Sequence, residues 1–238
     1  MLRHPVWGAI CLLAVSLVLC TDKLRTDAGP SAYALLVDEE EEDDGGDGDG
    51  DGSSSFSFSS PQATPDELAF GFYDGTCPNA EAVIASTVRE LFAADPNVAA
   101  ALVRLFFHDC FVHGCDASVL LDRIGGGKSE RDAAPNRSLR GFGAVDKIKA
   151  RLEKQCPGTV SCADILALAA RDSLVLVGGP TYPVLTGRRD SAGSFYDDVN
   201  IPAPNATYAM TLSAFARRGF TERETVALLG AHSIGKVQ

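Results

Sequence analysis

The chain has 238 residues, of which 45% are hydrophobic and 22% charged, an ordinary composition for a globular protein of one large domain or two small ones. Its formal net charge of −11 is concentrated in one stretch. Ten acidic residues lie between Asp38 and Asp51, and the remainder of the chain is close to neutral. Because no basic stripe is present, we expect no nucleic-acid partner.

An apolar run fills residues 6–20, directly after the basic residues Arg3 and His4. The run has the length of a signal-peptide core and falls short of the roughly 20 residues that cross a membrane. No second run of spanning length follows. The sequence therefore predicts a signal peptide over residues 1–20 and secretion, with no membrane association once this segment is removed.

Residues 21–67 contain the acidic run, Gly-Asp repeats and a Ser-rich stretch. Such a segment repels itself and buries too little surface to fold, so the pattern predicts a disordered acidic arm. One alternative is a calcium-binding EF-hand loop, because residues 47–52 match its opening. Its twelfth position is Phe58 instead of a bidentate Glu, and no helices flank it, which favours the arm.

From about residue 68 the apolar pattern is helical. Between residues 79 and 94 apolar side chains recur at three- and four-residue spacing. Ser161 and Thr221 each precede a helix-start pattern, and the glycines after residue 177 end the first of these elements. Strand-like alternation is almost absent. The sequence therefore predicts an all-α fold over residues 68–238.

Arg104 and His108 are four residues apart in a predicted helix that begins near Pro96. This spacing places a cation and an imidazole on one helix face. A buried structural histidine beside a solvent-exposed arginine would have the same spacing. Used together, however, the pair suits peroxide cleavage, because the imidazole can move a proton between the two oxygens while the guanidinium stabilises the charge that develops.

The loop after His108 is rich in oxygen ligands. Asp109, Asp116 and Ser118, with backbone carbonyls from the bend at residues 112–114, would suit Ca²⁺, although such residues near glycine are also common in plain turns. Cys110 and Cys115 are close enough in sequence to close the loop covalently.

His232 lies at the C-terminal end of an apolar segment, residues 225–232, that is predicted to be helical. It could stabilise the helix dipole, or it could be an axial haem ligand. Zinc is less consistent with the sequence, because there are only four histidines and none has zinc-site spacing.

Five cysteines remain once Cys11 and Cys20 are assigned to the signal segment. In an oxidising compartment this number predicts two disulfides and one cysteine left over. Either Cys162 or another thiol is free, or its partner lies outside this sequence.

Several blocks together resemble the secreted plant (class III) haem peroxidases, and the resemblance runs continuously from about residue 70 to residue 238. The blocks are residues 72–79, 104–118, 129–132, 140–142, 160–164, 187–190 and 230–236.

The resemblance implies a helical enzyme that binds haem b, reduces hydrogen peroxide and oxidises small phenolic donors one electron at a time. By motif position, His108 is implied as the distal acid–base group, Arg104 as the stabiliser of O–O cleavage and Phe107 as an aromatic wall over the haem. Asn136 would orient His108 and would itself be tied to Glu130. Two residues complete the set of roles: Pro202 for donor binding and His232 as the axial iron ligand.

The resemblance also implies two calcium sites, two disulfides and a secreted monomer, located outside the cell, in the cell wall or in the vacuole. The distal calcium ligands would be Asp109, Val112, Gly114, Asp116 and Ser118, and Ser233 would contribute to a proximal calcium. The implied disulfides are Cys77–Cys156 and Cys110–Cys115.

The family continues well beyond the motif around His232, so we expect the 238-residue chain to lack the C-terminal part of the domain. That part supplies the partner of Cys162, the other proximal calcium ligands and an aspartate bonded to the proximal imidazole. We therefore expect this chain to fold poorly and to bind haem weakly. The alternative function is a non-catalytic secreted module that keeps only the calcium loop and the disulfides.

Two glycosylation sequons begin at Asn136 and Asn205. Asn136 cannot carry a glycan and also orient His108, so we expect only Asn205 to be modified.

Overall fold

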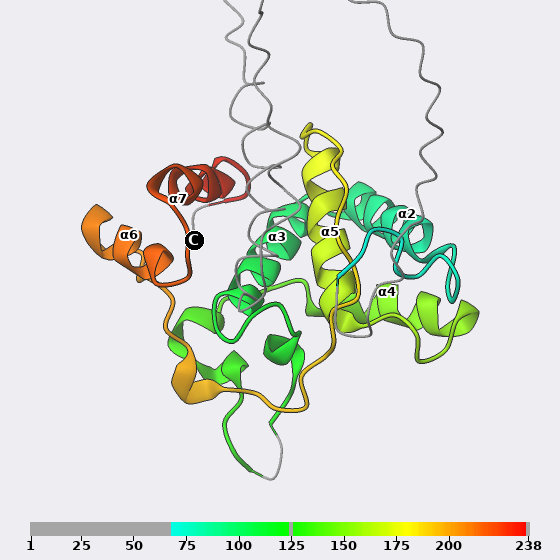
Figure 1. The fold of residues 1–238 in the computed structure, drawn as a ribbon, viewed down its shortest axis with the longest axis horizontal. Helices are drawn as coiled ribbons and strands as arrows, with labels where there is room; N and C mark the ends of the chain where they lie inside the picture. Colours follow the sequence, from blue (N-terminus) through cyan, green and yellow to red (C-terminus); the bar gives the residue numbers. More distant parts are fainter. Residues whose placement is uncertain (1–67, 124–125, 237–238) are drawn as a thin grey trace, which may run out of the picture.

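The computed structural model describes residues 68–123 and 126–236. The predicted signal peptide, the predicted acidic arm and the rejected EF-hand loop lie outside these residues. Figure 1 shows a helical fold built from two groups of helices.

The helices are α2 (Ala80–Ala94), α3 (Asn97–Cys110), α4 (Phe142–Gln155), α5 (Cys162–Leu176), α6 (Tyr208–Ala216) and α7 (Glu222–Leu229). Short 3₁₀ turns lie between them: η2 (Ser118–Leu120), η3 (Glu130–Asp132), η4 (Ala134–Asn136), η5 (Tyr196–Asp198) and η6 (Gly230–Ser233). Within the described ranges the only β-type pairing is one bridge, between Ala69 and Thr186. The predicted all-α fold is confirmed.

The predicted helix starts are confirmed at two places. The Ser161 hydroxyl accepts a hydrogen bond from the Asp164 N–H and so caps α5, and Thr221 and Glu224 form a reciprocal capping box on α7. Pro96 differs slightly from the prediction. It has helical backbone angles but stands just before α3, which begins at Asn97.

Helix α5 lies at the centre of the first group and packs against α2, α3 and α4 (Figure 1). It is apolar on nearly every side, and Ile165, Leu166 and Leu168 are fully buried. A helix with this pattern is stable only when other elements surround it. The neighbouring helices present narrower apolar faces, so the core forms where they meet α5.

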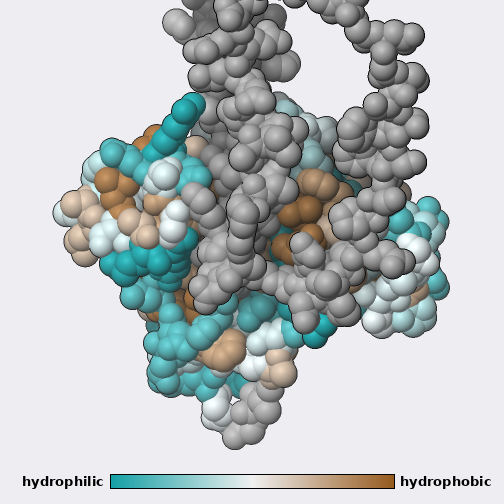
Figure 2. Space-filling model, in the orientation of Figure 1, coloured by the Kyte–Doolittle hydropathy of each residue, from teal (hydrophilic) through white to brown (hydrophobic). Residues whose placement is uncertain are grey.

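Helices α6 and α7 form a second, smaller group beside α3 (Figure 1). Phe215 of α6 packs on Phe111, at the end of α3, with ring centroids 4.9 Å apart. Arg218 donates two hydrogen bonds to the carbonyl of Phe111 and lies over its ring. Figure 2 shows apolar side chains exposed among polar ones over this group, and Met210 and Val226 are both more than half exposed.

The structure contains the disulfides Cys77–Cys156 and Cys110–Cys115, the two pairings that the resemblance implies. The first joins the segment before α2 to the end of α4, and the second closes the loop after α3. Cys162 is the described cysteine without a disulfide. Among residues 68–123 and 126–236, no helix is long and apolar enough to cross a membrane.

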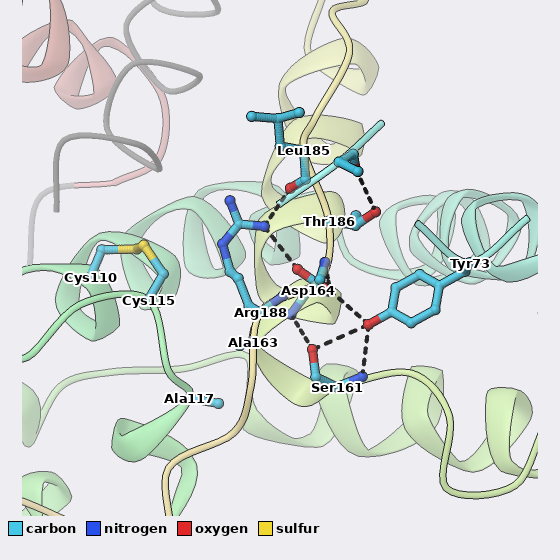
Figure 3. A network of polar contacts seen from close by, with 12 residues as sticks. Tyr73, Cys110, Cys115, Ala117, Ser161, Ala163, Asp164, Leu185, Thr186 and Arg188 are labelled. Atoms are coloured by element: carbon cyan, nitrogen blue, oxygen red, sulfur yellow. Dashed lines mark hydrogen bonds and ion pairs between the residues drawn. A yellow bond between two sulfur atoms is a disulfide. The ribbon is translucent and has the colours of Figure 1, made fainter. Parts of the chain in front are cut away.

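A buried ion pair joins α5 to the segment after it (Figure 3). One oxygen of Asp164 accepts from Arg188 Nη1 at 2.8 Å, and the other accepts from the Tyr73 hydroxyl at 2.6 Å and from the Gly187 N–H at 2.7 Å. Burial, helped by the charge of Asp164, raises the pKa of Tyr73. The sequence analysis missed this network, because its members are far apart in the sequence.

Candidate functional site

Helix α3 presents the central residues of the candidate site. Leu102, Leu105 and Phe106 are buried in the core, which fixes the rotation of the helix. His108 is 5% exposed, while Arg104, one turn earlier, is exposed to solvent. The structure therefore places the two residues on adjacent turns of one helix, as their spacing predicts.

A chain of hydrogen bonds holds the His108 imidazole. His108 Nδ1 lies 2.7 Å from Asn136 Oδ1, and Asn136 Nδ2 donates to the Glu130 carbonyl at 2.8 Å. A backbone carbonyl can only accept, so the amide NH₂ of Asn136 must face Glu130 and its oxygen must face His108. His108 Nδ1 therefore carries the proton, and Nε2 is left with a lone pair. The sequence analysis brought together these same three residues.

Glu130 is itself held by residues that the sequence analysis missed. Its backbone N–H donates to Ser194 Oγ at 2.8 Å, and its Oε1 accepts from the Phe195 N–H at 3.0 Å. Burial raises the pKa of the Glu130 carboxyl. Ser194 and Phe195 are more than 60 residues away in sequence and carry no motif, so no local pattern pointed to them.

The environment of His108 favours its neutral form. Burial, together with the positive charge of Arg104, lowers the pKa of His108 to about 4, although the hydrogen bond to Asn136 opposes the shift. A neutral imidazole with a lone pair on Nε2 can accept a proton. The arrangement can therefore act as a base near neutral pH.

The guanidinium of Arg104 is oriented by the loop that carries Asn136. Its nitrogens donate to the carbonyls of Pro135 and Ser138 and to the Ser138 hydroxyl, at 3.1 to 3.2 Å. One loop thus positions both the cation and, through Asn136, the imidazole. The sequence analysis did not identify Pro135 or Ser138 in this role.

Phe107 lies next to His108, with the two rings edge to face and their centroids 5.7 Å apart. It also packs against Phe111 and Phe215, so its ring belongs to the aromatic contact that joins α3 to α6. Its role as a wall over a haem stays a prediction.

The loop after α3 contains the predicted distal calcium ligands. Asp109 is fully buried, and its oxygens accept from the N–H groups of Ala117 and Val119. Ala117 has φ of +61°, a left-handed conformation that is rare outside glycine. The chain that follows the Cys110–Cys115 loop therefore turns back so that the N–H groups of Ala117 and Val119 face Asp109.

The chemistry of this loop fits a hard cation. Burial raises the pKa of Asp109 well above its usual range, and the nearby Asp116 and Glu130 raise it further. In the described part of the chain neither Asp109 nor Asp116 forms an ion pair. Ser118 Oγ is buried with no hydrogen bond of good geometry, although it lies near enough to the Glu130 carboxylate to lower its pKa. A bound Ca²⁺ would neutralise these carboxylates and take the free oxygen.

Within the described ranges, no three His, Cys, Asp or Glu side chains are close enough to hold a metal ion. The predicted calcium set needs only two carboxylates, with the carbonyls of Val112 and Gly114, so it stays a prediction.

His232 lies in a different setting from the one expected. Helix α7 ends at Leu229, and His232 sits exposed in the 3₁₀ turn η6. Its Nδ1 donates to the Leu229 carbonyl at 3.0 Å, which leaves Nε2 with a lone pair. Ser233 beside it is also exposed.

The chain after His232 returns to helix α3. A Cβ placed on Gly235 would lie 3.0 Å from Ala100 Cβ, one helical turn before Arg104. The turn that carries His232 is therefore close to the N-terminal half of the helix that carries His108. Whether the two imidazoles face one haem stays a prediction.

The remaining predicted residues lie in or near irregular segments. Pro202 is half-buried between η5 and α6. Asn205 is exposed, whereas Asn136 is 2% exposed and hydrogen-bonded at both ends of its amide. Glycan attachment at Asn205 alone stays a prediction.

The sequence of this chain is similar to those of known peroxidases. A sequence profile described as "Peroxidase" matches residues 84–238. The chain is 52% identical over 170 residues to Putative Peroxidase 48 of Arabidopsis thaliana, covering 71% of this chain and 42% of that protein. It is 51% identical over 171 residues to Peroxidase 28 of Arabidopsis thaliana, covering 71% of this chain and 53% of that protein. The chain spans about half the length of the curated relatives it matches.

Proposed function

Because this chain belongs to the peroxidase family, we propose that it acts as an extracellular haem peroxidase that reduces hydrogen peroxide and oxidises phenolic donors. The proposal rests on the hydrogen bonds that orient His108. The Glu130 carbonyl fixes the amide of Asn136, which fixes the imidazole of His108 with its basic nitrogen free. This tautomer leaves Nε2 able to accept a proton, which peroxide cleavage requires.

His108 would move the proton in peroxide cleavage. Its Nε2 accepts the proton from one oxygen of hydrogen peroxide. It then gives this proton to the other oxygen, which leaves as water. Arg104 stabilises the negative charge that develops on that oxygen as the O–O bond breaks. Asn136 acts as a positioning residue, since it touches His108 and not the peroxide.

The cofactor would be haem b, which would supply the two electrons that cleavage of the O–O bond consumes. His232 would hold it through Nε2, and Leu229 would orient the ring through Nδ1. Two phenolic donors would then each return one electron, near Pro202.

Calcium would bind to the loop between Asp109 and Ser118. Its chemistry there is structural: the ion would offset the buried negative charge and hold the loop that begins one residue after His108. A second calcium would use Ser233 and ligands outside the described residues.

Secretion is part of the same proposal. The apolar run at residues 6–20 and the two disulfides both suit an oxidising compartment. We place the protein outside the cell, as a monomer, with residues 68–238 as its peroxidase domain.

The test is peroxide-dependent oxidation of guaiacol by the purified chain titrated with hemin, together with the Soret absorbance. The His108→Leu variant should lose turnover by about 10²- to 10⁴-fold, the usual contribution of a general acid–base. His113→Gln is the matched control, because His113 is an exposed histidine of the same loop paired with Asp198. Equal turnover in the two variants would contradict the proposal.

The same titration tests the alternative function. A chain that takes up no hemin, yet whose melting temperature rises with Ca²⁺, would be the non-catalytic calcium and disulfide module. Calcium binding is expected under both functions, because within the described residues the buried Asp109 carboxylate has no cation beside it and the Ser118 hydroxyl has no good hydrogen bond.

A further inference from the structure

We propose that the acidic run at residues 38–51 binds within the same chain to a group of basic side chains on the outer face of residues 123–137. This group, the basic cluster, consists of Arg123, Lys128, Arg131 and Arg137. The inference does not depend on haem or on peroxidase activity.

The basic cluster surrounds a shallow cavity of about 460 Å³, completed by Asp132 and Tyr196. The cavity lies on the segment that also holds Glu130 and Asn136, on residues distinct from those of the candidate active site. No established or proposed function in the peroxidase reaction uses it.

Part of the charge in the cluster is already neutralised. Arg123 binds both carboxylate oxygens of Asp132, with Nε at 2.8 Å. Arg131 binds Asp122 at 2.6 Å and the carbonyls of Val119 and Leu120. These two arginines therefore hold the loop together and have little capacity for another anion.

Within the described ranges, Lys128 and Arg137 form no ion pair, although the charge of Lys128 helps to lower the pKa of Asp132. Lys128 Nζ lies 4.4 Å above the ring of Tyr196 and has no hydrogen bond to the described residues. Arg137 uses only Nε, which donates to the Asp132 carbonyl, and its two Nη nitrogens have no hydrogen-bond partner in the described ranges. Asp197 and Asp198 line the neighbouring cavity with Lys128, but Asp198 is bound to His113 at 2.7 Å.

The acidic run matches these two cations in charge. It carries ten carboxylates, while the rest of the chain is close to neutral. Individual exposed ion pairs are weak, so a small free anion would bind poorly to an open cavity with two available cations. A tethered polyanion has an effective concentration in the millimolar range, which makes the same weak contacts sufficient.

The connection is long enough for this contact. Residues 52–67 separate the acidic run from Leu68, and they can span roughly 55 Å when extended. A domain of this size has a radius of gyration of about 15 Å. The extended length of residues 52–67 therefore exceeds the width of the domain, so the acidic run can reach the basic cluster.

Carbodiimide cross-linking of the purified full chain tests the contact, because it joins a carboxylate directly to a lysine amine. We expect peptides that link Lys128 to residues 38–51. Lys147 and Lys154, which are exposed on α4 without an ion pair in the described ranges, serve as internal references. Links to Lys128 should exceed those to either reference and should disappear in 1 M salt, where screening acts over about 3 Å.

Matched charge reversals sharpen the test. Arg137→Glu keeps Lys128 but removes its neighbouring cation, and it should lower the Lys128 cross-link by about fivefold, the effect of one exposed ion pair. Lys154→Glu changes the net charge equally and should leave the link within about twofold. Similar losses in the two variants, or equal linking of all lysines, would overturn the proposal. So would cross-linked dimers whose yield rises with protein concentration, because they would place the contact between chains.

Discussion

The region from α2 to α5 and the segment from α6 to η6 are built differently. Eleven of the fifteen residues of α5 are buried, against two of the nine in α6. Both disulfides and the buried Asp164–Arg188 pair tie the first region to itself and to the segments on either side of it, whereas the second is attached mainly through Phe215 and Arg218. The first region therefore fixes its side chains through the core, and the second through a few surface contacts.

The two histidines show what this difference means for chemistry. His108 is 5% exposed and its partner Asn136 is held in turn by Glu130. His232 is exposed and has one backbone contact, from within its own turn. The proton-transfer group is thus positioned by the fold, while the candidate iron ligand is positioned only locally by the described residues.

The largest expected loss of stability comes from breaking the buried ion pair. Asp164→Asn leaves the buried guanidinium of Arg188 without its charge partner and should lower the free energy of unfolding by about 3–5 kcal/mol. Glu90→Gln, which breaks the exposed pair with Arg151, should lower the free energy of unfolding far less. Urea unfolding followed by circular dichroism measures both.

A double replacement separates the loss of the pair from the burial of an unpaired charge. Asp164→Leu with Arg188→Met removes both charges, and it should restore most of the stability that Asp164→Asn loses. If the double variant is no more stable than Asp164→Asn, then packing and the Tyr73 hydrogen bond, not the unpaired charge, explain the loss.

The next largest effect is on the reactivity of the Cys162 thiol, at the start of α5. A helix N-terminus normally favours a thiolate, but burial, aided by the negative charge of Asp190, raises the pKa of Cys162 to about 11. At pH 8 this leaves roughly 100-fold less thiolate than an ordinary cysteine has. Iodoacetamide labelling should therefore be slow at pH 8 and accelerate up to about pH 11.

Asp190→Asn is the variant that tests this cause. Removing the charge should lower the pKa of Cys162 and speed labelling at pH 8. Labelling of the natural chain at the rate of a small-molecule thiol would show that the buried region does not shield this residue.

Asn136→Val should reduce peroxide-dependent turnover by about 10- to 100-fold, because His108 loses the acceptor that fixes its tautomer. A general loss of folding would give the same result in a single variant. The double variant with His108→Leu resolves this, since a positioning residue has no further effect once the histidine is absent. Additive losses in the double variant would mean that Asn136 acts apart from His108.

The smallest loss of stability is expected in the segment from α6 to η6. Thr221→Ala removes the capping box of α7 and should cost about 1 kcal/mol. Hydrogen exchange should become faster at residues 222–229 and stay unchanged in α5, since the two regions share few contacts. Equal acceleration in both regions would show that the chain unfolds as one unit.

The sequence was sufficient to predict features that depend on local spacing. The helical period, the caps at Ser161 and Thr221 and the placing of Arg104 and His108 on adjacent turns all follow from residues close in the chain. The resemblance added the link between His108, Asn136 and Glu130. Each of these predictions involves either one element or a motif that was recognised as a block.

Contacts between distant segments could not be predicted in this way. Ser194 and Phe195 hold Glu130, and Tyr73 binds Asp164, across separations of 64 to 91 residues. Nothing in the side-chain types at these positions signals such a partner. The end of α7 was also predicted too late, because Gly230 ends the α-helix and His232 falls in the 3₁₀ turn that follows.

The atom that decides the protonation of His108 belongs to the main chain. Any amino acid at position 130 would supply the same carbonyl, so replacing the Glu130 side chain alone should leave the tautomer in place. A change that unwinds the turn at residues 129–132 would abolish it without altering a single reactive group. In screens of natural variants, loss of function from this network should therefore map to glycine or proline replacements in that turn more often than to replacements of its acidic side chain.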